Sequence, residues 1–316
     1  MPVPAPFGRA LCAMVTPFTP DGSLDLDGAQ RLADHLVGAG GGCDGIVVSG
    51  TTGESPTTTD AEKTALVRAV AEAVGGRGAV VAGVGTSDTR HTVALARAAE
   101  SAGADGLLVV TPYYSRPPQA DIEAHFRTVA DAASVPVLLY DIPGRTGTRI
   151  EPETLLRLAG HPRIAGVKDC SYDLLGASAV ISRTGLAYYS GVEEWNLPLY
   201  AVGGAGFIST VANAAGPALR AVLDAHDRGA NPDATRGHQR LLPLIELMMA
   251  SGLPGTVTAK ALLAALGLPA GPVRAPLRPA GRETAGRLVR AYEDLLSGAP
   301  SRGPIGEPAD TAPGTR

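Results

Sequence analysis

The stretch IAGVKDCS at residues 164–171 combines a short apolar run with a lysine at its end. The run from Ile164 to Val167 is apolar with β-branched residues at both ends, a pattern typical of a buried strand. Lysine is almost never fully buried unless it is paired or takes part in chemistry. Lys168 stands where this strand ends, so it is either an ordinary solvent-exposed residue or a side chain that the fold delivers into a site.

Similar apolar runs recur along the chain, and longer segments of helical period separate them. The expected strands lie at residues 10–15, 44–50, 79–85, 105–112, 135–143, 164–170, 186–191 and 206–210. Several of the helical segments end in glycine, as helix C-termini commonly do. Strands that alternate with helices predict an α/β fold with a parallel sheet. Eight strands is the number that closes a (β/α)8 TIM barrel, and a doubly wound open sheet is the competing architecture.

Beyond the eighth expected strand, the 316-residue chain continues with helical segments alone. We therefore expect a (β/α)8 barrel at residues 8–215 and a C-terminal helical extension at residues 216–298. From residue 299 to residue 316 the composition turns to proline, glycine, serine and charge. This composition is typical of a disordered tail.

Composition and charge limit the class of protein and its partners. Hydrophobic residues make up 45% and charged residues 18% of the chain, as in globular proteins. A net charge of −4 without a basic run argues against nucleic acid and anionic membrane as partners. No apolar stretch is long enough to span a bilayer and no signal-peptide pattern is present, so we expect a cytoplasmic protein. Cys12, Cys43 and Cys170 fit free thiols, and no histidine or cysteine spacing indicates a metal site.

The active site of a (β/α)8 barrel lies at the C-terminal ends of its strands. At those ends the sequence places GTTGE at 50–54, TPYY at 111–114, YDIPGR at 140–145, Lys168, Ser190-Gly191 and GFIST at 206–210. A lysine amine can attack a ketone to give an iminium, which makes the adjacent carbon a nucleophile once it loses a proton. Burial lowers the pKa of such an amine, and Tyr140 can move protons. The N–H groups of residues 51–53 can bind one carboxylate and Arg145 a second.

Each of these residues also has an ordinary structural interpretation. A lysine at a strand end is commonly solvent-exposed, and GTTG is also typical of a plain turn. Tyr113 and Tyr114 are equally consistent with aromatic packing, and Arg145 with a surface turn. No single residue decides between the interpretations, but the coincidence of these residues at one end of the barrel favours a site.

The sequence resembles the dihydrodipicolinate synthase/N-acetylneuraminate lyase family. The resemblance covers residues 8–296 and rests on five motifs in the same order: GTTGES at 50–55, VTPYY at 110–114, LYDIPGRT at 139–146, GVKD at 166–169 and GGAGFIS at 203–209. It implies that Lys168 forms a Schiff base with pyruvate and that Tyr140 is the proton donor and acceptor. Thr51 and Tyr114 would complete the proton relay, with Tyr114 reaching in from a neighbouring subunit of a homotetramer built as a dimer of dimers.

The same resemblance implies the substrates. Thr52, Ile208 and Gly191 would contact pyruvate, and Arg145 would hold the carboxylate of the second substrate. An arginine in YDIPGR is characteristic of the synthases that condense pyruvate with L-aspartate 4-semialdehyde in the diaminopimelate and lysine pathway. No cofactor or metal is implied, because the covalent imine on Lys168 supplies the electron sink.

One segment departs from the family pattern. After the seventh strand the synthases commonly have SGDD, whereas this chain has SGVEEW at residues 190–195. Val192 replaces an acid near the mouth of the site, and Trp195 adds bulk. A pyruvate aldolase of the same family with another acceptor, such as a hydroxy-oxoacid or a keto-deoxy sugar acid, is therefore an alternative. A barrel that binds a keto acid without catalysis is a third.

The resemblance also bears on regulation. Feedback-sensitive relatives bind lysine at the dimer interface, with histidines at the positions of Asp60 and Lys63 and a carboxylate at that of His91. Here Lys63 would place a cation beside a cationic effector, and His91 removes an acidic partner. We therefore expect weak inhibition by L-lysine.

Overall fold

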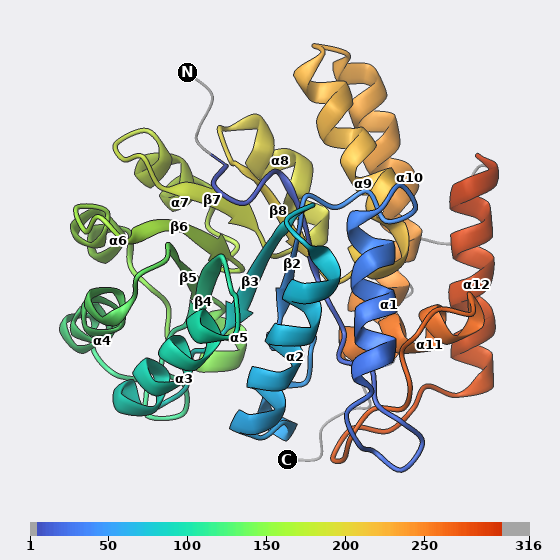
Figure 1. The fold of residues 1–316 in the computed structure, drawn as a ribbon. Coiled ribbons are helices and arrows are strands. Elements are labelled where there is room, and N and C mark those ends of the chain that lie inside the picture. Colours follow the sequence, from blue (N-terminus) through green and yellow to red (C-terminus); the bar gives the residue numbers. More distant parts are fainter. Residues whose placement is uncertain (1–4, 299–316) are drawn as a thin grey trace, which may run out of the picture.

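Eight short strands pair side by side in sequence order and close into a parallel barrel, with helices around it (Figure 1). The structure is a computed structural model that describes residues 5–298. The strands are β1 Ala10–Ala13, β2 Gly45–Val48, β3 Ala79–Gly83, β4 Gly106–Val110, β5 Val137–Asp141, β6 Ile164–Asp169, β7 Ala187–Ser190 and β8 Gly206–Ser209. The predicted TIM barrel is confirmed, and the open sheet is excluded because β8 pairs with β1.

Each of the eight strands is followed, directly or after a short loop helix, by a helix on the outside of the barrel. They are α1 Leu26–Val37, α2 Asp60–Val74, α3 Thr89–Ser101, α4 Gln119–Ala132, α6 Pro152–Leu158, α7 Leu174–Ile181, α8 Asn196–Ala201 and α9 Ala212–Asp227. Short helices also occur in the loops: η1 Ser55–Thr57, α5 Pro143–Thr146 and η2 Glu193–Trp195. Local sequence fixes several helix starts. At α2, the Thr59 side chain accepts from the Glu62 N–H while Glu62 accepts from the Thr59 N–H, a capping box.

Two layers of apolar side chains fill the barrel and its surroundings. Successive residues of a strand point to opposite faces, and both faces are buried here, so the strands read as continuous apolar runs. Leu139 and Val167 pack outwards against the helices. Leu138, Tyr140 and Ile208 lie in the cluster that fills the barrel interior. The barrel is therefore packed inside, and its sheet geometry decides which side chains reach the mouth.

The C-terminal helices gather on one side of the barrel (Figure 1). After α9 come α10 Asn231–Met249, α11 Gly255–Ala265 and α12 Arg282–Ser297, and these helices pack on one another. The predicted boundary at residues 215/216 coincides with a kink in α9, where Ala215 has φ −121° and ψ 28°. The division into barrel and extension stays a prediction, and the predicted disordered tail lies outside the described residues. None of the helices within residues 5–298 combines the length and apolar character needed to cross a membrane.

Candidate active site

The strands β5 and β6 place the two principal predicted catalytic side chains next to each other. Tyr140 and Lys168 are register partners on these parallel strands. Because Val167 packs outwards against the helices, the alternation of side chains turns Lys168 into the barrel. Lys168 is 6% exposed, and its Nζ lies 4.5 Å from the centroid of the Tyr140 ring. The exposed-lysine interpretation is therefore wrong.

Burial sets the protonation of this pair. Desolvation lowers the pKa of the Lys168 amine from its ordinary value of 10.5, an effect that nearby Cys170 opposes and Arg145 reinforces. Desolvation also raises the pKa of the Tyr140 phenol well above 10.0, although a hydrogen bond with Thr51 partly offsets this. A neutral amine is thus favoured beside a phenol that keeps its proton. This is the combination that nucleophilic attack on a carbonyl needs.

The turn at residues 50–54 follows β2 and lies at the same end of the barrel. The Glu54 N–H donates to the Thr51 carbonyl oxygen at 3.1 Å, which closes the turn. The hydroxyl of Thr52 lies 2.9 Å from that of Thr210 at the end of β8. Among the described residues, the N–H groups of Thr51 and Thr52 have no hydrogen-bond acceptor. They are free to bind an anion such as a carboxylate.

A cavity of about 620 Å³ opens at the C-terminal ends of the strands. Thr51, Tyr140 and Arg145 line it, and they come from the ends of β2 and β5. Tyr140 also contacts Lys168, so its ring joins the cavity to the buried amine. The Arg145 side chain is exposed on the short helix α5, where its guanidinium is available to an anionic ligand. The structure thus brings these four predicted residues together.

Gly191 and Ile208 lie deeper in the barrel. A Cβ on Gly191 would stand 2.4 Å from Cys170 Sγ and 2.7 Å from Lys168 Cε, so a side chain at this position would displace the lysine. Ile208 is 1% exposed and belongs to the interior cluster that also contains Tyr140. Both residues therefore shape the space around the amine.

Tyr114 is the predicted residue that the structure places apart from the others. Its side chain is 95% exposed, and its backbone has a φ of +74°, which is uncommon for a residue other than glycine. It does not line the cavity, whereas its neighbour Tyr113 does. The packing interpretation does not hold for Tyr114, because it has almost no contact with the rest of its own chain.

The segment at residues 190–195 contains a buried acid that the sequence reasoning missed. Glu193 is 2% exposed, and its Oε1 accepts hydrogen bonds from the Ser209 hydroxyl at 3.0 Å and the Thr210 N–H at 2.8 Å. Desolvation raises the pKa of its carboxyl group. Val192 packs in the barrel interior, and Trp195 contacts Tyr172 edge-on at 5.6 Å between ring centroids. The sequence signal for this buried acid was the position of Glu193 shortly after the buried strand β7.

The metal-ligating residue types do not cluster in the described part of the chain. No group of three or more histidine, cysteine, aspartate or glutamate side chains within residues 5–298 could hold a metal ion. Cys12, Cys43 and Cys170 are all buried and free, which confirms the prediction of unpaired thiols. The groups that the predicted residues bring to the cavity and to its inner end are an amine, a phenol, hydroxyl groups and a guanidinium.

Comparison with known proteins places this arrangement in a family. Residues 6–294 match the Dihydrodipicolinate synthetase family. The 4-hydroxy-tetrahydrodipicolinate synthase 1 of Streptomyces coelicolor is 71% identical over 295 residues, which are 93% of this chain and 96% of that protein.

Solved structures of dihydrodipicolinate synthases match the fold of this chain. A crystal structure of the enzyme from Cyanidioschyzon merolae with lysine bound has a TM-score of 0.88 and 38% identity, covering 92% of this chain and 98% of that one. The enzyme from Acinetobacter baumannii, solved in complex with pyruvate, has a TM-score of 0.86 and 31% identity, covering 92% and 99%. The chain therefore belongs to the dihydrodipicolinate synthetase family.

Proposed function

We propose that this chain condenses pyruvate with L-aspartate 4-semialdehyde and that Lys168 carries the covalent imine. The chain is a lyase of the 4-hydroxy-tetrahydrodipicolinate synthase type, in the pathway to diaminopimelate and lysine, as its close relatives indicate. The observation that carries the assignment of Lys168 is its burial in the barrel, with a lowered amine pKa, beside the Tyr140 ring.

The first half of the reaction builds the electron sink. The neutral Lys168 amine attacks the ketone carbon of pyruvate to form a carbinolamine. Tyr140 donates a proton to the departing hydroxyl group, which leaves as water, and an iminium remains on Lys168. Burial favours this step because it lowers the pKa of the amine and keeps the phenol protonated.

The second half forms the carbon–carbon bond. The Tyr140 phenolate left by the first half takes a proton from the pyruvate methyl group, which converts the iminium to an enamine, and the enamine carbon attacks the aldehyde carbon. The aldehyde oxygen takes up this proton from Tyr140, and attack of the amino group of the semialdehyde on the iminium carbon then displaces the product from Lys168 and returns the free amine. Thr51, as hydrogen-bond partner of Tyr140, and Tyr114 from a neighbouring subunit relay protons to and from it.

Substrate binding uses the groups around this pair. The free N–H groups of Thr51 and Thr52 bind the pyruvate carboxylate, with Ile208 and Gly191 shaping the pocket. Arg145, exposed at the cavity wall, binds the carboxylate of the semialdehyde. The iminium formed on Lys168 is the electron sink, so the proposed reaction needs no cofactor or metal. We place the enzyme in the cytoplasm, where its substrates are made.

The exposure of Tyr114 supports a homotetramer built from tight dimers. Tyr114 completes a proton relay when a second copy of the chain brings it to the cavity. Leu175 on α7 is 83% exposed and Tyr172 is 59% exposed, which gives a second apolar surface for pairing of dimers.

Trapping with borohydride tests the assignment of Lys168 as the Schiff-base residue. The result is easy to interpret because the chain has three lysines, Lys63, Lys168 and Lys260. Borohydride with pyruvate should reduce the imine to one stable adduct, which peptide mass analysis locates on Lys168. Lys168→Ala should lose the adduct, Lys63→Ala should keep it, and EDTA should leave turnover unchanged. An adduct on another lysine, or none with folded protein, would falsify the Schiff-base assignment.

A further inference from the structure

The C-terminal helices contact the turn at residues 50–54 through a buried ion pair. Lys260 on α11 places its Nζ 2.6 Å from Glu54 Oε1, and their side chains are 3% and 1% exposed. The other oxygen of the same carboxylate, Oε2, accepts a hydrogen bond from the backbone N–H of Arg274 at 2.8 Å. Glu54 therefore joins the turn to two separate parts of the C-terminal extension.

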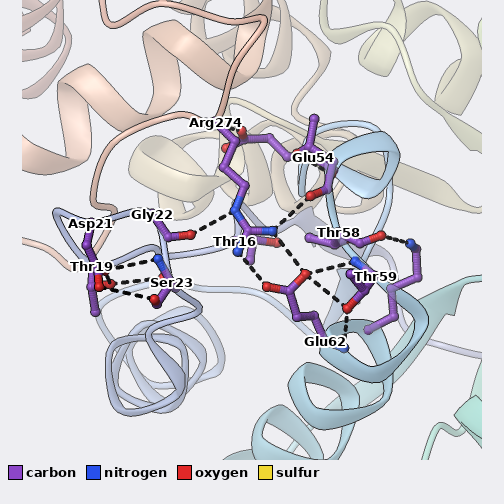
Figure 2. Close-up of polar contacts among 12 residues, drawn as sticks. Thr16, Thr19, Asp21, Gly22, Ser23, Glu54, Thr58, Thr59, Glu62 and Arg274 are labelled. Atoms are coloured by element: carbon purple, nitrogen blue, oxygen red, sulfur yellow. Dashed lines mark hydrogen bonds and ion pairs between the residues drawn. The ribbon is translucent and has the colours of Figure 1, made fainter.

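The Arg274 side chain fixes the segment that supplies this N–H. Its guanidinium donates to the carbonyl oxygens of Gly22 at 2.9 Å and Thr57 at 2.8 Å, and it forms an ion pair with Glu62 at 2.5 Å. Figure 2 shows the guanidinium between Gly22 and Glu62, with Glu54 close by. Arg274 thus links the first loop of the chain, the helix η1 and the start of α2.

The two residues before Glu54 are anchored as well. The Thr256 hydroxyl on α11 donates to the Thr52 carbonyl oxygen at 3.1 Å. The Thr16 hydroxyl, just beyond β1, donates to the Gly53 carbonyl oxygen at 2.6 Å. Three consecutive residues of the turn are therefore held from outside, by α11, by the segment after β1 and by the segment of Arg274.

The backbone conformation of the turn requires such support. Glu54 has a φ of +57°, a left-handed conformation that is costly for a residue with a Cβ and persists where the surroundings enforce it. The free N–H groups of Thr51 and Thr52 bind an anion well if they are already aligned, because aligning them on binding would weaken the interaction.

We propose that Lys260 and Arg274 are positioning residues of the active site, which hold the N–H groups of Thr51 and Thr52 in place through Glu54. The C-terminal extension then contributes to pyruvate binding without touching pyruvate. This inference rests on the proposed function, because it takes these N–H groups as the carboxylate site. The ordinary alternative is that the cluster stabilises the fold and leaves substrate binding alone.

A matched pair of arginine variants distinguishes a positioning role of this cluster from a purely structural one. Arg274→Met removes the guanidinium that fixes the segment supporting the turn at residues 50–54. Arg220→Met removes an arginine of similar exposure, 28% against 19%, that pairs with Asp44 and a backbone carbonyl at the opposite, N-terminal end of β2. The measured quantities are the melting temperature and the pyruvate concentration that gives half-maximal borohydride trapping. Both variants should lower the melting temperature.

If the cluster positions the turn, the two variants should differ in the pyruvate concentration that gives half-maximal trapping. Arg274→Met should raise the half-maximal pyruvate concentration on the order of 10- to 100-fold, as small misplacements of binding groups do, while trapping at saturating pyruvate persists. Arg274→Lys, which keeps a cation for Glu62, should recover part of the loss, and Arg220→Met should match the wild type. If Arg274→Met does not fold, the double variant Glu54→Gln with Lys260→Met, which removes both buried charges, gives the same comparison.

An unchanged pyruvate concentration in folded Arg274→Met and in the double variant would overturn the proposal and leave a purely structural cluster. A failure of the proposed function is recognised separately, because the wild-type protein itself would then form no imine.

Discussion

Tyr140 and Lys168 are register partners on β5 and β6, with the lysine Nζ 4.5 Å from the centroid of the tyrosine ring. Both side chains point into the barrel because they occupy matching positions on adjacent parallel strands. The hydrogen-bonded sheet thus fixes the relative placement of amine and phenol. Sites built on strands hold their groups more firmly than sites built on loops.

Gly191→Ala should impair imine formation while sparing the fold. The new methyl group would stand 2.7 Å from Lys168 Cε, at the mobile end of that side chain, so the lysine can move aside and the amine is displaced. We expect the rate of borohydride trapping to fall by about 100-fold, in line with the cost of misplacing a reacting group, with a small change in melting temperature.

The matched control for this variant is Gly185→Ala, where a Cβ would meet no atom within 4 Å. It should trap pyruvate at the wild-type rate. Wild-type trapping by Gly191→Ala would mean that the space around Lys168 is less restricted than the structure indicates.

Arg145→Ala should damage use of the semialdehyde far more than formation of the pyruvate imine. Removing one partner of a charge pair that becomes desolvated costs about 2 kcal/mol or more, roughly a 30-fold loss of kcat/KM. Trapping with pyruvate alone should change little. Arg163→Ala, at an exposed position before β6, is the control. Equal losses in trapping and turnover would indicate a structural role for Arg145.

The same assay distinguishes between acceptors. Measuring kcat/KM for aspartate semialdehyde, a hydroxy-oxoacid aldehyde and a sugar-derived aldehyde tests whether Val192 and Trp195 alter the choice of second substrate. We expect the semialdehyde to be preferred, because Arg145 matches its carboxylate. A preferred neutral aldehyde would contradict the assignment.

The stability of the fold should depend on pH through Asp141. Burial, followed by the nearby Asp169 carboxylate, raises the pKa of Asp141 from 3.8 to about 7. The folded state therefore holds a proton that the unfolded chain releases, so this contribution to stability is complete below about pH 4 and is lost as pH rises to about 7. Asp141→Asn should flatten the fall in the free energy of unfolding between these limits. An identical slope in variant and wild type, measured by urea unfolding, would contradict this.

L-lysine at millimolar concentration should barely inhibit the enzyme. Asp60, Lys63, His91 and Tyr113 also line the cavity. The Asp60 carboxylate already pairs with His91 at 2.9 Å, and the Lys63 ammonium would repel a cationic effector. A steep inhibition curve at sub-millimolar lysine, abolished by Tyr113→Ala, would show that an inhibitory site is present.

Local patterns were sufficient to predict the barrel. The apolar run at residues 164–167 predicted β6 and the one within residues 135–143 predicted β5, because buried parallel strands leave continuous apolar sequence. The approximate ends of these runs located Tyr140 and Lys168 at the C-terminal mouth. The short helices η1 and α5 were not predicted, since segments of three or four residues carry too little periodicity.

The support of the site could not be predicted in the same way. Lys260 lies in the otherwise apolar segment at residues 258–267, which signals a buried cation in need of a partner. Nothing in the local sequence says that the partner is Glu54, because their contact depends on how α11 packs against the barrel. The orientation of Tyr114 likewise follows from a left-handed backbone conformation that its neighbours in sequence do not dictate.

The hydrogen bond between Glu54 and Arg274 joins residues 220 positions apart. At a synthesis rate of about 5–20 residues per second, roughly 11–44 s separate their addition to the growing chain. A nascent chain that has just completed β8 at Ser209 contains every strand of the barrel and still lacks Lys260 and Arg274. At this rate about 3–13 s separate the addition of Ser209 from that of Arg274, so during synthesis on the ribosome the sheet can close seconds before the turn at residues 50–54 acquires its supports.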